Sequence, residues 1–501
     1  MDQSSITPNT SNQQLVINSD NESATALLQE KQTRRRENLS EVSFLEFMTV
    51  GILCFVNLIN YMDRFTLAGV LGDVKEEFKI GDDCAGFLQT VFVVAYMVFA
   101  PIFGYLGDRY SRRIIMAFGV ALWSLTTFLG SFIANFTMFT FFRGLVGIGE
   151  ASYSTIAPTI ISDLFVGNVR SKMLAFFYFA IPVGSGLGYI VGSVAGAAAG
   201  NWRWGLRVTP FLGAIAVVLI YWLMEDPERG QAEESHMKPT TYNQDLRALI
   251  RNPSFMLSTL AFTCVAFVTG ALAWWGPQFI FLGLSMQPDN HGITLESVSY
   301  KFGLVGMFAG ALGVPLGSAL AQRLRARLPD SDPLVCGFAL LASAPLVYFA
   351  LVLVGYHVSL SYLFIFLGMT TLNLTWSIVA DIILYVVIPP RRSTAEAFQI
   401  LISHMFGDAG SPYLVGVISE SLKKSFSPID TEPTSVVKFK SLQYALFVTC
   451  FVEVIGGIFF LLTAIYIVRD KLKVDRAIAE AEAQTAEPSH SSAHEEIGGG
   501  E

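Results

Sequence analysis

Long apolar runs, separated by short polar connections, recur along almost the whole chain. A helix needs about 20 mainly apolar residues to cross a bilayer, and each run is long enough to supply them. The pattern therefore predicts an all-α polytopic membrane protein. We place its twelve transmembrane helices near 46–71, 84–107, 113–134, 137–164, 171–197, 206–224, 254–283, 298–322, 334–355, 359–387, 394–420 and 442–468.

Lysine and arginine collect in alternate connections, which predicts the orientation because cytosolic loops are enriched in these residues. The loops that hold Arg109, Arg170, Arg323 and Arg391 are assigned to the cytosol, and so are both termini. The longest of these connections follows the sixth helix. The expected domains are a disordered cytosolic tail at 1–44, a six-helix bundle at 45–224, a cytosolic linker at 225–252, a second six-helix bundle at 253–470 and a disordered cytosolic tail at 471–501.

The two halves share a sequence repeat. VRSKMLAFF at 169–177 corresponds to RRSTAEAFQ at 391–399, and each leads to a glycine–tyrosine stretch. These stretches are GLGYIVG at 186–192 and GSPYLVG at 410–416. The nearly constant offset predicts an internal duplication, which is typical of transporter folds built from two related halves.

Composition narrows the class of protein. Hydrophobic residues make up 52% of the chain and charged residues only 15%, as expected of a polytopic membrane protein. The net charge of −8 comes largely from acids in the tails and loops, and no basic face points to a nucleic-acid partner. The five cysteines are scattered without disulfide or metal-ligand spacing, so neither a metal site nor a cofactor is predicted.

One cytosolic loop carries a recognisable motif, GYLGDRYSRR at 104–113. It resembles the signature of the major facilitator superfamily, with Ser111 where glycine is commoner. The residues that fit the signature are Gly104, Asp108, Arg109, Arg112 and Arg113. An acid at a helix end beside a basic loop predicts a gating contact that breaks when the halves rock. The alternative is an ordinary positively charged cytosolic loop.

Four charged residues lie inside predicted membrane helices: Asp63 and Arg64 in LINYMDRFTLAG at 58–69, and Arg143 and Glu150 in RGLVGIGEASYSTIAP at 143–158. Arg143 and Glu150 are seven residues apart and share a helix face. Such charges usually face a bundle interior or a water-filled cavity. Burial favours a neutral carboxyl and a nearby arginine a charged one, so Asp63 and Glu150 are predicted to carry protons. Arg143 is predicted either to neutralise Glu150 or to bind an anion. A purely structural ion cluster is the alternative.

The eleventh predicted helix contains SHMFGDAGSPY at 403–413, where His404 and Asp408 lie four residues apart on one face. Histidine changes charge near neutral pH, so this pair is a second candidate for proton coupling. Ser403 cannot complete a hydrolase triad with them, because adjacent helical residues point about 100° apart. Trp376 and Asp381 in the tenth helix are further candidates, and Asp381 suits a structural role near the cytosolic end.

The fifth helix carries glycines at every fourth position, from Gly184 to Gly200, with Gly186 between two of them. This row makes one helix face nearly bare, which predicts close packing against another helix. Close packing that can slide would also suit an interface between rocking halves.

Longer strings resemble the spinster family of major facilitator transporters. They are NYMDRFTLAGVLGDV at 60–74, APIFGYLGDRYSRR at 100–113, the stretch 143–158, FYFAIPVGSGLGYIVGS at 177–193, VADIILYVVIP at 379–389 and SHMFGDAGSPYLVGVIS at 403–419. The resemblance implies proton-driven or proton-gated transport of lysophospholipids or sphingoid phosphates such as sphingosine-1-phosphate. It implies that Asp63 and Glu150 are protonatable, that Arg64 and Arg143 contact charges or the head group, and that Tyr189, Trp376 and His404 line the cavity. Asn373 stands where several relatives have an aromatic residue.

The partners expected from this resemblance are the lysolipid or sphingolipid, protons and membrane lipids. A porter for another small organic anion or a sugar stays open, as does a lipid sensor that does not transport. The family works on lysosomal membranes and at the cell surface. ESATALL at 22–28 resembles an acidic dileucine signal with one extra residue of spacing, which favours the lysosome or late endosome over the plasma membrane.

Overall fold

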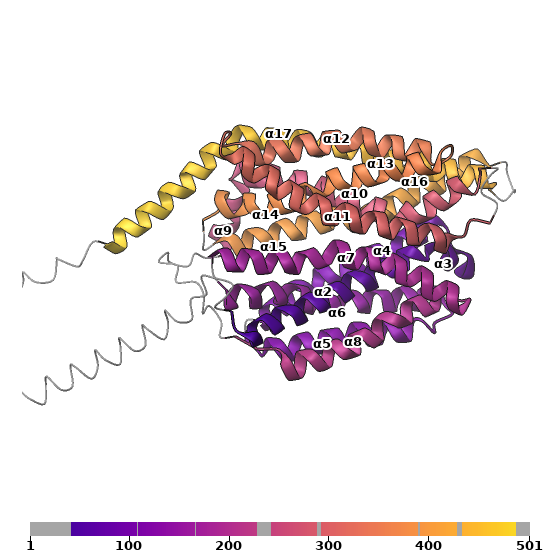
Figure 1. Ribbon diagram of the computed structural model, residues 1–501, viewed down its shortest axis with the longest axis horizontal. Coiled ribbons are helices and arrows are strands. Elements are labelled where there is room, and N and C mark those ends of the chain that lie inside the picture. Colours follow the sequence, from indigo (N-terminus) through magenta and orange to yellow (C-terminus); the bar gives the residue numbers. More distant parts are fainter. Residues whose placement is uncertain are drawn as a thin grey trace, which may run out of the picture.

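The computed structural model describes residues 42–107, 109–165, 167–227, 242–287, 292–388, 391–427 and 433–486, and the regular structure within these ranges is helical. The helices form two layers of roughly parallel rods, α2 to α8 in one and α10 to α17 in the other (Figure 1). The two layers are the predicted halves, here called the N half and the C half.

The N half contains seven described helices because the chain turns through a short helix before its second crossing. They are α2 (Phe44–Gly69), α3 (Leu71–Phe78), α4 (Asp82–Gly107), α5 (Arg112–Gly130), α6 (Phe136–Leu164), α7 (Gly167–Ala199) and α8 (Arg203–Leu223). Ser43 begins the first crossing as an N-cap, and it forms a reciprocal capping box with Glu46.

The C half has helices at each of the six crossings predicted for it. They are α10 (Pro253–Leu284), α11 (Leu295–Arg325), α12 (Ser331–Leu353), α13 (Val358–Asn373), α14 (Thr375–Val386), α15 (Arg392–Ser403), the π-helix η3 (His404–Asp408), α16 (Ser411–Phe426) and α17 (Ser435–Ala486). In the described part of the chain, ten helices are apolar enough to span a membrane. Neither α6 nor the run from α15 to α16 is among them. These are the crossings that carry Glu150 and His404.

Two crossings are interrupted inside the C half. The tenth breaks at Leu374, next to Asn373, whose Nδ2 donates to the carbonyl of Met369 at 2.7 Å. The eleventh contains η3, where the Ala409 amide donates to His404 O at 3.0 Å across five residues. Gly407 departs from helical geometry there, with φ −95° and ψ −105°. The predicted segments 359–387 and 394–420 overlap these two crossings, but the second ends six residues before Phe426, and neither anticipated the breaks.

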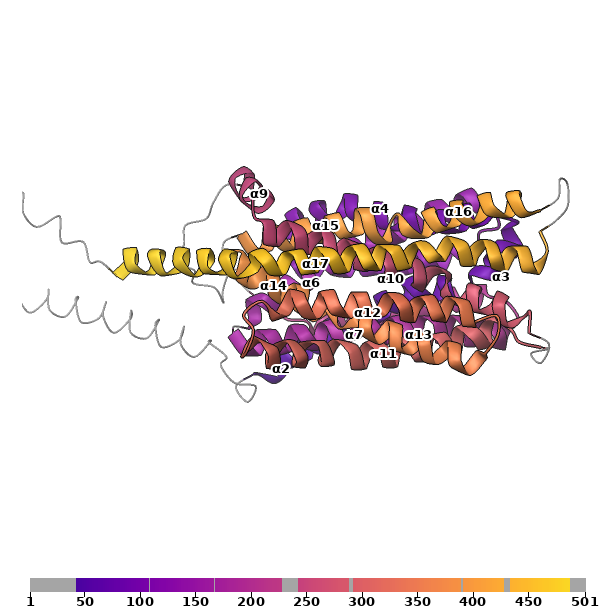
Figure 2. The same cartoon turned by 90° about the horizontal axis from the view of Figure 1, so that it is seen from above.

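The predicted tails and linker differ in part from the structure. Helix α17 runs to Ala486, so residues 471–486 are helical where a disordered tail was expected. Alanine and alternating charges favour helix even without an apolar face, which explains the extension visible in Figure 2. Helix α9 (Tyr242–Ile250) lies within the predicted linker. Residues 1–41, 228–241 and 487–501 lie outside the described ranges.

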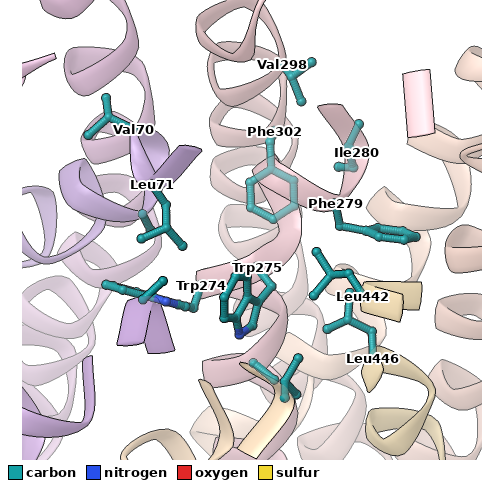
Figure 3. Close-up of a cluster of buried hydrophobic side chains, with 14 of the residues drawn as sticks. Val70, Leu71, Trp274, Trp275, Phe279, Ile280, Val298, Phe302, Leu442 and Leu446 are labelled. Carbon is teal, nitrogen blue, oxygen red and sulfur yellow. The ribbon is translucent and has the colours of Figure 1, made fainter. Parts of the chain in front are cut away.

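The two halves share one hydrophobic core at the outer end, the end opposite the predicted cytosolic loops. Leu71 of the N half and Trp274, Trp275 and Phe302 of the C half belong to a single buried cluster (Figure 3). At the opposite end, where the predicted cytosolic loops lie, each half has its own core. The cluster around Trp123 is drawn from the N half apart from Ala409, and another cluster is drawn from the C half. The described chain is therefore closed at its outer end.

Glycines bring helix backbones together in two distinct ways. The predicted row packs α7 against α2 inside the N half: a Cβ on Gly188 would lie 2.5 Å from Met62 O. Gly186, which is off that row, meets Gly303 of α11 across the two halves. The row therefore stabilises one half, and the contact between halves depends on the glycine beside it.

Replacing Gly86 by valine is expected to separate the outer ends. A Cβ there would lie 2.3 Å from Pro412 O and 2.8 Å from Tyr413 Cα, so α4 and α16 would have to move apart. Spin labels at Thr137 and Ser421, exposed positions at the outer ends of the two halves, should report a longer distance. Gly51→Val is the control, because a Cβ at that glycine meets nothing within 4 Å. An unchanged distance in Gly86→Val would contradict this packing.

Candidate functional site

The centre of the N half contains a buried ion pair between α2 and α6. Arg64 Nη2 donates to Glu150 Oε2 at 3.3 Å, and the two residues are only 7% and 0% exposed. Among the described residues, Arg64 Nε and Glu150 Oε1 have no hydrogen-bond partner. Buried polar groups are normally satisfied, so this pair has capacity for a proton, water or ligand.

Arg143 lies beside this pair but does not neutralise Glu150 directly. Within the described residues it forms no ion pair closer than 4 Å, although it interacts electrostatically with Asp63 and Glu150. Both guanidinium groups contact the ring of Phe92 of α4, Arg64 at 4.8 Å and Arg143 at 4.5 Å from its centroid. The sequence did not determine which arginine pairs with Glu150, and in the structure the partner is Arg64.

Asp63 points away from Arg64 although the two are adjacent in sequence. It is 1% exposed and accepts hydrogen bonds from the hydroxyl of Thr127, at 3.2 Å, and from that of Thr209. These residues belong to α5 and α8, so the carboxylate is held inside the N half. Neighbouring helical positions diverge by about 100°, which accounts for the separation. Of the two predicted carboxylates, Glu150 is paired with Arg64 and Asp63 is not.

A run of contacts connects the Arg64–Glu150 pair to the C half. The Arg64 guanidinium lies 5.8 Å from the ring of Tyr96. That ring is 5.6 Å from the ring of His404, whose Nδ1 lies 2.8 Å from Asp408 Oδ1. Asp408 also interacts electrostatically with Arg64. The structure thus brings together Glu150, Arg64 and His404, and adds Tyr96, which sequence reasoning missed.

The π-helix holds His404 and Asp408 in this position. Thr90 Oγ1 of α4 donates to Ala409 O at 2.6 Å, which fixes the end of η3 to the N half. A Cβ on Gly407 would lie 2.7 Å from Ala266 Cβ, so this turn also packs tightly against α10. Single π-turns often occur at functional sites. The glycines around Asp408 were the sequence signal for this irregularity.

The cytosolic motif forms its described ion pair inside the N half. Arg112 Nη1 donates to Asp163 Oδ2 of α6 at 2.5 Å, and Arg109 stacks over the ring of Tyr105 at 4.2 Å. Asp108 lies outside the described residues. A gating contact between the halves therefore stays a prediction for Gly104, Asp108, Arg109, Arg112 and Arg113.

The C half contains a counterpart of this ion pair. Arg325 follows Gly317 by eight residues, as Arg112 follows Gly104. Arg325 Nη2 donates to Asp381 Oδ2 at 2.8 Å, and its Nε contacts Asp332. Asp381 therefore joins α14 to α11, and it lies midway along α14 and not at its end. The shared spacing of glycine and arginine was the available signal for this pair.

Tyr189 and Trp376 lie apart from the buried charges. Tyr189 is 4% exposed in the outer cluster, where its hydroxyl donates to Ala273 O at 2.5 Å across the halves. Trp376 packs edge-on against Phe262 at 5.2 Å within the C half. Contact of either residue with a substrate stays a prediction.

An ion cluster at the outer end was missed by sequence reasoning. Asp82 at the start of α4 is 1% exposed and accepts from the ammonium groups of Lys75 and Lys423. Ser419 Oγ donates to it at 2.8 Å, and its own amide donates to Glu420 Oε2 at 3.3 Å. We call this the outer ion cluster. It joins α3 and α4 to α16, and its members are too far apart in sequence to be paired by any local pattern.

Acid pH is expected to favour closure of the outer end through Asp73 on α3. Burial, with repulsion from Glu296 of α11 and from Glu76, raises the pKa of Asp73 to about 6. Opening would return it toward its ordinary value, so the closed form binds more protons. Closure should strengthen by up to about tenfold from pH 7 to pH 5 and weaken as pH rises through 6. The Thr137–Ser421 spin-label distance should show this change. Asp73→Asn should close equally well at both pH values, because an amide is always neutral, and a pH response equal to that of the wild type would contradict the assignment.

The chain is similar to known proteins over most of its length. A sequence model of the Major Facilitator Superfamily matches residues 53–411. Protein spinster of Drosophila melanogaster is 58% identical over 490 residues, covering 89% of this chain and 81% of that protein. Protein spinster homolog 1 of Homo sapiens is 52% identical over 435 residues, covering 85% and 81% respectively.

Solved structures agree on the fold. A crystal structure of a bacterial homologue to the human lysosomal transporter spinster, inward-facing and unoccupied, matches with a TM-score of 0.75 at 19% identity, covering 86% of this chain and 99% of that one. A D-xylose–proton symporter matches with a TM-score of 0.62 at 14% identity, covering 84% and 97%. The chain belongs to the spinster family of the major facilitator superfamily, which comprises membrane transporters and not enzymes.

Proposed function

We propose that the protein is a proton-coupled transporter of lysophospholipids or sphingoid phosphates, including the sphingosine-1-phosphate class, that works by alternating access. The observation that carries this proposal is the run of contacts from Glu150 through Arg64 and Tyr96 to His404. It connects a buried carboxylate in one half with a histidine in the other. Movement of the halves would therefore change the surroundings of both groups.

Competition for Arg64 is the coupling step. When Glu150 is charged, it holds the Arg64 guanidinium. A proton on Glu150 removes that attraction and frees Arg64 for an anion. Guanidinium groups bind phosphate through paired, charge-assisted hydrogen bonds. Arg143, whose Nε has no partner among the described residues, would supply a second donor.

His404 is the proposed second proton site. Its ring is partly accessible, with 23% of the side chain exposed, and Asp408 orients it. The two proton sites lie on opposite sides of the interface between halves. Proton movement between them would require the contacts of Tyr96 to change.

The lipid class is supported by charge and by similarity. A lysolipid combines an anionic head with one long chain, and this site offers two buried arginines beside the aromatic rings of Phe92 and Tyr96. One of the similar structures is of a bacterial homologue of human spinster, a lysosomal transporter. We therefore propose a lysosomal or late endosomal membrane for this chain, with the plasma membrane as the alternative.

Flux into proteoliposomes tests the proposal. The purified chain would be assayed with lysophosphatidylcholine, sphingosine-1-phosphate and D-xylose at about pH 5 and about pH 7. The wild type should transport a lysolipid at rates that depend on pH. Glu150→Gln should lose that dependence, because an amide cannot carry the proton.

Glu453→Gln is the matched control. Glu453 is also a fully buried glutamate, but it contacts Ser343 of α12 at 3.1 Å and lies in the C half. Its variant should keep the pH response. Normal pH-dependent flux in Glu150→Gln would refute the proton role. Transport of D-xylose alone would identify a sugar porter, and absence of all flux in folded protein would favour a sensor.

A further inference from the structure

A pocket of about 220 Å³ lies on the cytosolic side of the C half, between α9, the start of α10, the end of α14 and α17. Figure 2 shows α9 at the end of the bundle from which α17 extends. We call this space the α9 pocket. It lies in the C half, whereas Arg64 and Glu150 lie in the N half, so it is separate from the proposed transport site.

The α9 pocket is lined by three cationic side chains and one carboxylate, namely Arg251, Arg391, Lys473 and Asp470. The carboxylate is already used: Asp470 accepts from Ser254 Oγ at 2.7 Å and from Lys473 at 3.0 Å, with Arg469 at 3.3 Å. It anchors α17 to the start of α10. Positive charge therefore predominates in the lining.

Arg251 is the cation with spare capacity. It is exposed, and among the described residues its guanidinium makes no ion pair or hydrogen bond. Arg391 already donates to Asp245 of α9 at 2.8 Å. The neighbouring Asn252 fixes the backbone, since its Nδ2 donates to Val386 O at 2.8 Å and its Oδ1 caps α10. The pocket is thus formed before any ligand binds.

The other side of the pocket is apolar. Leu249, Val386 and Val474 are buried and contribute to its lining. Next to the cations, Ile250 and Leu472 are 54% and 50% exposed. The volume is below the roughly 300–1,000 Å³ of sites that enclose drug-sized molecules. It fits a head group whose chains remain outside.

We propose that the α9 pocket binds the head group of an anionic phospholipid of the cytosolic leaflet that carries a phosphomonoester. Basic pockets between helices at this membrane surface suit such head groups. A phosphomonoester carries a charge of about −1.5 to −2, which matches an excess of cations around a neutralised carboxylate. Binding would hold α9, part of the connection between the halves, against α14 and α17.

The test uses the purified full-length chain and fluorescent dioctanoyl phosphatidylinositol 4-phosphate, with binding followed by anisotropy. Arg251→Gln and Lys473→Gln should each raise the Kd by about tenfold, because each removes a charged donor. Arg247→Gln is the matched control, an exposed arginine on α9 that is not part of the lining, and should change the Kd by less than about twofold. Inositol 1,4-bisphosphate should compete at least about tenfold more weakly than unlabelled lipid.

Equal affinity in wild type, Arg251→Gln and Lys473→Gln would overturn the proposal. The probe would then bind at another site, such as the buried arginines of the N half. Equal competition by inositol 1,4-bisphosphate would overturn the lipid source and indicate a soluble phosphate ester. Glu150→Gln should bind the probe as the wild type does. This result separates the α9 pocket from the proposed transport function.

Discussion

Replacing Asp82 by asparagine is expected to shift the protein from outer-closed to outer-open by more than about a hundredfold. Asp82 is the shared acceptor for Lys75 and Lys423, one from each half. Without its charge, the two ammonium groups would share a single carboxylate, that of Glu420, which lies 3.3 Å from Lys423. Removing one partner of a buried ion pair costs about 3–5 kcal/mol, and opening relieves this cost because both lysines then reach water.

Spin labels at Thr137 and Ser421 would measure this shift directly. In Asp82→Asn the short distance should give way to a longer one at neutral pH. Asp83→Asn is the control, because Asp83 is the next residue, less buried, and makes no contact with either lysine of the outer ion cluster. If Asp82→Asn keeps the short distance, the shared hydrophobic core alone holds the outer end closed.

Replacing Arg64 by methionine is expected to lower the free energy of unfolding by about 3–5 kcal/mol at neutral pH. Methionine fills a similar volume but leaves Glu150 fully buried without a cation. The loss should be smaller in acid, where protonation of Glu150 removes the buried charge. Unfolding in detergent with increasing dodecyl sulfate, followed by tryptophan fluorescence, would measure these differences.

A second variant separates the ion pair from general packing. Arg64→Met combined with Glu150→Gln should recover more than half of the lost stability, because no uncompensated charge remains. Arg109→Met, which alters an exposed arginine stacked on Tyr105, should cost less than about 1 kcal/mol. Equal losses in the single and double variants of the Arg64 site would mean that shape, and not charge, determines its stability.

Helix positions and the charged site were the features that the sequence predicted best, because apolar runs and charges inside membrane helices each have one common structural cause. Apolar runs of bilayer length predicted the crossings. Charged residues within them, such as Glu150, predicted a site in the bundle interior. The family signature and the repeat predicted two related halves. These features depend on local composition and spacing, so no three-dimensional information was needed.

Pairing was harder to predict because it depends on how helices are rotated. Arg64, Arg143, Asp63 and Glu150 could combine in several ways, and the choice follows from the face of α2 that packs on α7. Gly188 sets that rotation by bringing the α7 backbone against Met62. The outer ion cluster shows the same limit, since Asp82 and Ser419 are 337 residues apart.

The π-helix between α15 and α16 also changes the helical register of the eleventh crossing. A π-turn holds one residue more than an α-turn, so forming or losing one changes the rotation of the helix that follows it. Loss of this π-turn, with its extra residue taken into regular α-helix, would rotate the segment beyond it by about 100°. That segment carries Gly416 and Lys423, which contact Asp82. A change of winding at His404 would therefore rotate the end of α16 that contacts Asp82 at the outer surface.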